Sequence, residues 1–224
     1  MSLQIHLTSL RIGERCLLKH LQLDCPGGSI TTLMGPSGSG KSTLLSAVCG
    51  TLSTNIQFEG QVLLNGLRID TLPTQARRVG ILFQDDLLFA HMNVLENLLF
   101  AMPRKPGGNA HQHRTWATSQ AMQALADAEL SGFESANPAT LSGGQRARVS
   151  LVRALLAEPE ALLLDEPFSR LDQTLRSRFK DFGFAQCRAR QIPTLLVTHD
   201  PADIADAGRV MTLTPPDRDT QTHA

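Results

Sequence analysis

The segment from Gly35 to Ser42 constrains this chain more than any other stretch. It reads Gly-Pro-Ser-Gly-Ser-Gly-Lys-Ser and fits G-x-x-x-x-G-K-[ST] at every fixed position. The apolar run Ile30–Met34 before it predicts a buried strand, and the run Ser42–Cys49 after it predicts a helix that stops at Gly50. This order favours a phosphate-binding P-loop over a Gly/Ser loop that contains a lysine by chance.

The residue types in this loop suit a phosphate ligand. Glycine lets the backbone turn tightly and approach the ligand, so that N–H groups and the helix dipole converge on phosphate oxygens. Lys41 can reach the β- and γ-phosphates, and the Ser42 hydroxyl can ligate Mg²⁺. The predicted nucleotide-binding residues of the loop are Gly35, Pro36, Ser37, Gly38, Ser39, Gly40, Lys41, Ser42 and Thr43.

Charge and cysteine usage narrow the class of protein. The 224 residues carry 21 Lys and Arg against 21 Asp and Glu, so no overall field attracts nucleic acid, although a local patch could still do so. The four cysteines form no C-x-x-C pair, which predicts buried thiols in a reducing compartment. No apolar stretch is long enough to cross a bilayer, and Met1–His6 lacks a signal-peptide layout, so we expect a soluble or peripheral cytoplasmic protein.

The order of patterns along the chain predicts an α/β protein with a helical insertion. Alternating and apolar runs predict strands before and after the P-loop, and Asn65-Gly66 predicts a hairpin turn. Helical spacing begins near Asn93 and continues, across a breaker-rich loop, to about Glu158. We therefore expect one domain over 1–214, with 1–84 and 161–214 as nucleotide-binding core and 85–160 as helical subdomain, followed by a disordered tail over 215–224.

Two further strands are predicted to end in chemically active side chains. Ala161–Leu164 is followed by Asp165 and Glu166, so Asp165 can hold Mg²⁺ and Glu166 can orient or deprotonate an attacking water. The strand Pro193–Thr198 ends at His199, whose imidazole can hydrogen-bond a γ-phosphate. The alternatives are solvated acids and a structural histidine.

A second predicted anion site precedes the run Arg146–Leu156. Ser142 stands where a helix N-cap is expected, and the glycines after it expose helix-start N–H groups. The segment comprises Ser142, Gly143, Gly144 and Gln145. Taken alone, the segment is more typical of an ordinary capped helix.

Together these motifs resemble the ATP-binding cassette (ABC) family. Leu141–Gln145, Leu162–Pro167, Ser169–Asp172 and Val197–Asp200 are similar to its signature, Walker B, D-loop and H-loop. Gln84 matches the Q-loop glutamine, for which the resemblance implies roles as metal ligand and catalytic group. The likeness covers nearly the whole chain and implies a RecA-like P-loop NTPase core with an N-terminal antiparallel β subdomain.

Within the family, the region around Gln84 resembles small bacterial importer ATPases, and the chain is similar to their uncharacterised YnjD-like set. The resemblance implies a head-to-tail dimer in which Ser142, Gly144 and Gln145 of one copy close over ATP on the other. It also implies Mg²⁺, a membrane permease, a solute-binding protein and a location on the cytoplasmic face of the inner membrane. Apolar residues of the insertion either receive the permease or pack internally: Leu87, Leu88, Phe89, Met92 and Val94.

Three departures from the family pattern affect these expectations. Leu10–Gly13 has no aromatic residue to stack on adenine, so Arg11 or Ile12 would have to replace it and base selectivity is open. The D-loop has Arg170 where alanine is commoner. The chain stops soon after His199, so we expect no regulatory C-terminal domain.

Two other functions compete with transport. One is an ABC protein that works with a membrane partner in cell division or as a scaffold. The other is a small-molecule P-loop kinase, which leaves Leu141–Gln145 and His199 unexplained. None of these motifs identifies the transported solute. They also leave open whether the chain pairs with itself or with a paralogue.

Overall fold

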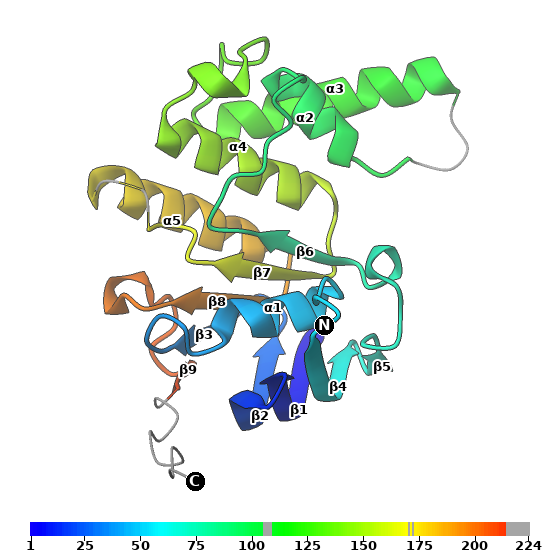
Figure 1. The fold of residues 1–224 in the computed structure, drawn as a ribbon. Helices are drawn as coiled ribbons and strands as arrows, with labels where there is room; N and C mark the ends of the chain where they lie inside the picture. Colours follow the sequence, from blue (N-terminus) through cyan, green and yellow to red (C-terminus); the bar gives the residue numbers. More distant parts are fainter. Residues whose placement is uncertain (105–108, 170, 172, 214–224) are drawn as a thin grey trace, which may run out of the picture. The chain divides into compact units, whose positions relative to one another are not determined.

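The computed structural model describes residues 1–104, 109–169, 171 and 173–213. By the density of its internal contacts the chain divides into two compact units (Figure 1). The first comprises 1–79, 160–166 and 187–224, and the second comprises 80–159 and 167–186. Strand β6 (Val79–Leu82) begins in the first unit and continues into the second. The predicted boundaries of core and helical subdomain stay a prediction.

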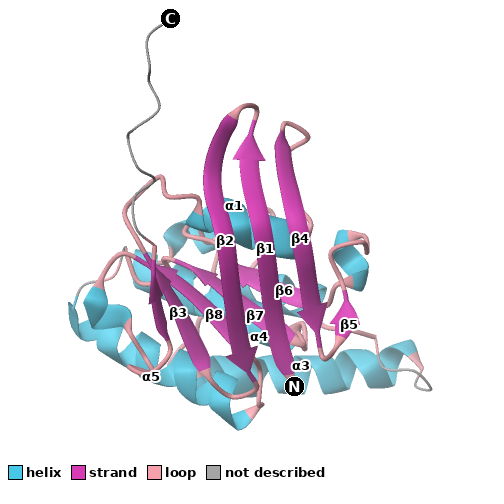
Figure 2. Cartoon of the chain, turned by 90° about the horizontal axis from the view of Figure 1, so that it is seen from below, coloured by secondary structure: helices cyan, strands magenta, loops and turns pink. Residues whose placement is uncertain are grey.

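The first unit contains an antiparallel sheet in the order β2-β1-β4-β5. Its strands are β1 (Ser2–Ile12), β2 (Arg15–Pro26), β4 (Ile56–Leu64) and β5 (Leu67–Arg68), and Figure 2 shows the three long strands side by side. Burial alternates along β1, as expected for a strand with one face on the core. Asn65 and Gly66 both have positive φ and join β4 to β5, which confirms the predicted hairpin turn.

A parallel sheet lies in the same unit and carries the P-loop. Its strands within the unit run in the order β7-β8-β3-β9, namely β7 (Ala161–Asp165), β8 (Thr194–Thr198), β3 (Ile30–Met34) and β9 (Val210–Thr212). Every residue of β7 and β8 is buried, because a parallel sheet is covered on both faces. The helix α1 (Lys41–Cys49) follows β3 and ends at Gly50, whose φ is 81°, as predicted.

The second unit is helical and has its own core. Its helices are α2 (Val94–Ala101), α3 (Ala110–Asp127), α4 (Gly143–Leu156) and most of α5 (Gln173–Ala189), whose last three residues belong to the first unit. Fully buried side chains from α2, α3 and α4, among them Leu98, Leu125 and Val149, form one apolar cluster. Asn93, Asn109 and Ser142 each close a capping box at the start of a helix.

Short 3₁₀ turns complete the described structure at Thr74–Ala76, Pro138–Thr140 and Pro201–Asp203. In the described part of the chain, no helix has both the length and the apolar character needed to cross a bilayer.

All four cysteines are free. Burial raises the pKa of Cys25 and of Cys49 to about 12, but Cys16 is only half-buried, so the prediction of buried thiols is wrong for that residue.

Candidate nucleotide site

The predicted chemical groups of the first unit gather at the carboxyl ends of its parallel strands. The P-loop follows β3, Asp165 is the last residue of β7, and His199 follows β8. Parallel pairing places these strand ends at one edge, with Leu33 opposite Val197 and Asp165 also opposite Val197. Sequence patterns predicted this convergence, and the strand register confirms it.

In this chain the P-loop lysine, Lys41, is hydrogen-bonded to the backbone of the loop itself. Lys41 is buried, and its Nζ donates hydrogen bonds of 2.8 Å to the carbonyls of Gly35 and Pro36. Gly38 and Gly40 have φ of 77° and 87°, a conformation that side-chain-bearing residues rarely adopt. Burial lowers the pKa of Lys41, while the carboxylates of Glu166 and Asp165 oppose that shift. The lysine is thus a cation held where phosphate would be bound.

Ser42 and Asp165 form the part of the site that suits a metal ion. The Ser42 hydroxyl donates a 3.0 Å hydrogen bond to Asp165 Oδ1. Burial raises the pKa of Asp165, and the Ser42 hydrogen bond counteracts this. One hydroxyl and one carboxylate match Mg²⁺, which takes few protein oxygens and fills its other positions with water and phosphate. Among the described residues no group of three or more His, Cys, Asp or Glu could hold a metal ion alone.

Glu166 and His199 contact each other, a pairing that the sequence did not predict. His199 Nδ1 lies 3.0 Å from Glu166 Oε1, and the Glu166 N–H donates to the carbonyl of Val197. When the Glu166 carboxylate is ionised it can only accept, so the proton of this hydrogen bond then belongs to Nδ1. A neutral ring then has no proton on Nε2. His199 can donate to both Glu166 and a phosphate only when the ring is charged.

In the second unit, Ser142 caps α4 as predicted. Its side chain accepts a 3.2 Å hydrogen bond from the Gln145 N–H, and Gln145 Oε1 accepts one of 2.8 Å from the Ser142 N–H. A Cβ on Gly143 would meet nothing within 4 Å, so the backbone there is open to a ligand or partner. At Gly144 a Cβ would lie 3.1 Å from Leu175, so this glycine permits close packing.

A small recess in the second unit brings Gln84 together with the signature segment. Gln84, Asp86, Gly143 and Ser169 all line it. The remaining lining residues are Leu82, Phe83, Arg146, Ala147, Pro167 and Leu171. Gln84 belongs to a different unit from Ser42 and Asp165, so its role as metal ligand stays a prediction.

Sequence reasoning missed the contacts that hold the segment after Gln84. Arg146 Nε donates to Asp86 Oδ2 at 2.7 Å, and Ser150 Oγ donates to the Asp86 carbonyl at 2.6 Å. Arg153 donates to the carbonyls of Asp86 and Leu87. Polar residues at i, i+4 and i+7 share one face of a helix, so the spacing 146, 150, 153 was a usable signal.

The candidate permease contacts of the helical insertion differ in burial. Val94 is fully buried and Leu88 packs on the core of the second unit, which supports internal packing for both. Leu87 and Phe89 are exposed. The Arg11 side chain donates to the carbonyl of Glu14, and its role toward a base stays a prediction. Arg170 and the tail 215–224 lie outside the described residues.

Comparison with known proteins decides the family. The model of the ABC transporter family matches residues 18–169, which is more than half of the chain and includes the P-loop, the signature and the Walker B strand. The chain belongs to the ABC transporter family. It is therefore an ABC ATPase, an ATP-binding and ATP-hydrolysing subunit.

Curated relatives place this ABC ATPase among transporter subunits. It is 51% identical over 199 residues to the uncharacterized ABC transporter ATP-binding protein YnjD of Escherichia coli, covering 88% of each chain. It is 38% identical over 204 residues to the sulfate/thiosulfate import ATP-binding protein CysA of Mycobacterium bovis. That alignment covers 91% of this chain but only 56% of CysA. The predicted resemblance to importer ATPases and to the YnjD-like set is confirmed.

Solved structures support the fold class of the ABC ATPase. The dimeric structure of the ATP-binding cassette MJ0796 bound to ADP and Pi has a TM-score of 0.76 and 28% identity, over 95% of this chain and 94% of that chain. A second dimeric structure of MJ0796, described as a bacterial ABC transporter cassette, also has a TM-score of 0.76. The predicted P-loop NTPase fold with parallel and antiparallel sheets is confirmed.

Proposed function

We propose that this chain is the ATPase subunit of an ABC importer and drives solute uptake through a partner permease. The observation that carries the proposal is the division of its phosphate-binding devices: the P-loop lies in one unit and the capped Ser142–Gln145 segment in the other. Support for import comes from the CysA relatives, which are named as sulfate/thiosulfate import proteins. The chain would work at the cytoplasmic face of the membrane, as a peripheral subunit.

In this proposal, two copies of the chain bring both devices to one nucleotide. In the proposed head-to-tail dimer, Lys41 of one copy holds the phosphates while Ser142 and Gly143 of the second copy approach the γ-phosphate. The open space at Gly143 supports such an approach. The start of α4 adds positive potential that favours an anion. Loss of the γ-phosphate then weakens the interface, so hydrolysis is coupled to reopening. MJ0796, a relative by structure, is dimeric.

Ser42 and Asp165 would hold Mg²⁺, with Gln84 as a third ligand. Mg²⁺, when bound, neutralises charge that develops on the phosphate oxygens. Glu166 receives the proton of the attacking water, and the His199 hydrogen bond at 3.0 Å orients its carboxylate. Because Glu166 follows the buried strand β7 directly, its backbone is held firmly while its side chain reaches the site.

The permease would dock on exposed apolar side chains of the second unit. Phe89 and Phe100 are 36% and 64% exposed, and their rings meet edge to face at 4.9 Å. The Arg153 guanidinium lies 5.6 Å from the Phe89 ring centroid and so restrains it. Exposed aromatic rings that are already ordered lose little entropy on binding. They suit a short amphipathic helix of the permease, and a periplasmic solute-binding protein would deliver the solute.

Glu166→Gln tests the ATPase mechanism and the dimer. The amide cannot accept a proton from water, so we expect hydrolysis to fall by about 10²- to 10⁴-fold while ATP binding persists. Size-exclusion chromatography with ATP should show a stable dimer for this variant. The matched control is Glu160→Gln, which precedes β7 and pairs with Arg78. Normal turnover by Glu166→Gln, or a monomer at saturating ATP, would contradict the proposal.

Co-purification tests the transport role. Membranes that contain the chain should yield a multi-span permease, together with a solute-binding protein if the direction is import. Replacing Phe89 and Phe100 with serine should release the permease without changing the ATPase rate of the isolated subunit. Recovery of only a peptidoglycan-related partner would favour the cell-division or scaffold alternative instead.

A further inference from the structure

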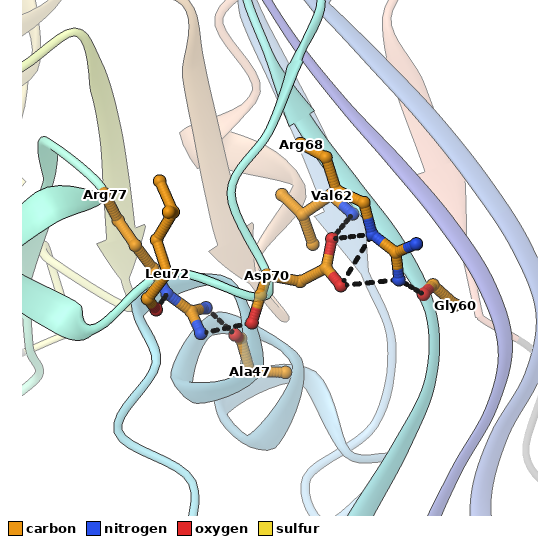
Figure 3. A network of polar contacts seen from close by, with 7 residues as sticks. All are labelled: Ala47, Gly60, Val62, Arg68, Asp70, Leu72 and Arg77. Atoms are coloured by element: carbon orange, nitrogen blue, oxygen red, sulfur yellow. Dashed lines mark hydrogen bonds and ion pairs between the residues drawn. The ribbon is translucent and has the colours of Figure 1, made fainter.

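Arg77 is a buried cation of the first unit whose side chain donates hydrogen bonds to main-chain carbonyls, among them those of Ala47 and Leu72 (Figure 3). Its side chain donates from Nη1 to the carbonyls of Ala47 and Val48, at 2.7 and 2.9 Å. It also donates from Nη2 to Asp70 O at 2.8 Å and from Nε to Leu72 O at 2.9 Å. With only 8% of the residue exposed, these contacts replace water.

The nearby carboxylate of Asp70 has other partners. It accepts hydrogen bonds from Arg68, at 2.9 to 3.1 Å, and from the Val62 N–H at 2.9 Å (Figure 3). Burial lowers the pKa of Arg77, as expected for a cation held away from water, although the charge of Asp70 opposes that shift. A buried charge needs compensation. Here it comes largely from carbonyl dipoles.

Two of those carbonyls, of Ala47 and Val48, belong to the last turn of α1. Carbonyls in the last turn of a helix lack intrahelical partners and carry the negative end of the helix dipole. Arg77 therefore satisfies and neutralises that end of α1. Thr74 adds a hydrogen bond of 2.8 Å from its hydroxyl to the carbonyl of Gly50.

Gly50 leaves the space that Arg77 fills. A Cβ at this position would lie 2.6 Å from both Cζ and Nε of Arg77. The positive φ of Gly50 also ends α1 at this point, with its N–H bonded to the carbonyls of Ser46 and Ala47. Gly50 therefore both ends α1 and leaves room for the Arg77 side chain.

The other end of the same helix begins with Lys41 and Ser42. α1 has nine residues, so it is about 13 Å long, and a tilt at the anchored end displaces the N–H groups at the P-loop end. Hydrogen bonds to phosphate tolerate shifts of only a few tenths of an ångström. We propose that Arg77 is a positioning residue for ATP: it anchors the C-terminal end of α1 so that the N-terminal end holds the phosphates.

The test compares Arg77→Met, which keeps the side-chain volume but removes the donors, with Arg77→Lys, which keeps the charge. Arg78→Met is the matched control, because Arg78 is the exposed neighbour and pairs with Glu160. ATP dissociation constants, KM and kcat are measured below the melting temperature of the least stable variant. We expect Arg77→Met to bind ATP at least tenfold more weakly, with KM rising more than kcat falls. Arg77→Lys should be intermediate, and Arg78→Met should stay within twofold of the wild type.

A folded Arg77→Met protein that melts earlier but binds ATP as tightly as the wild type would overturn the inference, since the arginine would then only stabilise the fold. If Arg77→Met does not fold, unchanged ATP affinity in Arg77→Lys overturns it, and a loss of at least threefold supports it. This inference deepens the proposed function. Failure of the wild type itself to bind ATP would instead refute the proposed function.

Discussion

The hydrogen bond between His199 and Glu166 determines which ring nitrogen of His199 is left to contact a phosphate. Because Nδ1 donates to the carboxylate, the ring orients Glu166 through one nitrogen and can serve a phosphate only through the other. Glu166 is held from both sides, by His199 at its side chain and by Val197 at its N–H. Both of these contacts lie within the first unit.

Substituting His199 separates these two roles. Asparagine places its amide nitrogen near the position of Nδ1, and glutamine places its own near Nε2. If orientation of Glu166 dominates, His199→Asn should retain about tenfold more kcat than His199→Gln or His199→Ala. Steady-state ATPase kinetics on the folded variants measure this. The reverse order, with glutamine the better substitute, would assign the main role to the phosphate contact.

At the scale of elements, a buried asparagine in the second unit holds the segment that leads into α2. Asn97 on α2 is fully buried, and its side chain accepts from the Phe89 N–H at 2.8 Å and donates to the carbonyls of Phe89, Met92 and Asn93. It thereby fixes the irregular segment that precedes α2. Asp86, earlier in the same segment, is hydrogen-bonded to Arg146 and Ser150 of α4.

Asn97→Leu should destabilise the protein by about 2–3 kcal/mol, since the Phe89 N–H and the Met92 carbonyl lose their hydrogen bonds to a buried side chain. The carbonyls of Phe89 and Asn93 each keep a main-chain donor. Chemical denaturation followed by circular dichroism measures the loss. Gln123→Leu is a suitable control, because the Gln123 amide donates to exposed Asp127 on the surface of α3. A loss below 0.5 kcal/mol would mean that water takes over these hydrogen bonds.

The elements themselves were largely predictable because local rules govern them. Apolar runs predicted the buried strands β3, β7 and β8, Gly50 predicted the end of α1, and Ser142 predicted the start of α4. The short edge strand β9 was missed, because Val210–Thr212 is too brief for any periodicity. Arg77 and Asn97 were missed for a different reason. A single arginine or asparagine has no sequence pattern, and only tertiary packing shows which main-chain groups it contacts.

At the scale of the whole molecule, the two units divide the family's motifs between them. The first holds Lys41, Asp165, Glu166 and His199, and the second holds Gln84 and the segment Ser142–Gln145. Motif order in the sequence predicted the family and its chemistry. It could not predict which segments pack together, since 167–186 associates with the helices although it follows the Walker B strand directly.

Asp206 is expected to make the stability of the first unit depend on pH. Its carboxylate accepts from the Ile30 N–H on β3 at 2.8 Å and from Arg188 at 2.6 Å. Burial alone would raise the pKa of Asp206, but these hydrogen bonds and the charges of Arg188 and Arg209 lower it overall. In the unfolded chain an aspartate has a pKa of about 3.9. Because the folded-state pKa of Asp206 lies lower, ionised Asp206 stabilises the fold above pH ~3.9, and this contribution is lost as the pH falls through the folded-state pKa.

Asp206→Asn should therefore lower the melting temperature at pH 7, and the gap to the wild type should close as pH drops below about 4. Thermal unfolding across that range measures the effect. Asp127→Asn, at an exposed site on α3, should show no such convergence. A gap that stays constant from pH 7 to pH 3 would show that the ionised form of Asp206 contributes nothing.

The left-handed backbone of Glu166, with φ of 46°, also limits what can replace it. A β-branched side chain fits that conformation poorly, and forcing one there costs about 1–2 kcal/mol. In a saturation library, valine, isoleucine and threonine at this codon would therefore be depleted by misfolding before chemistry is even assayed. Asparagine, glutamine and glycine would survive as folded but inactive proteins, so abundance and turnover must be scored separately to read this position correctly.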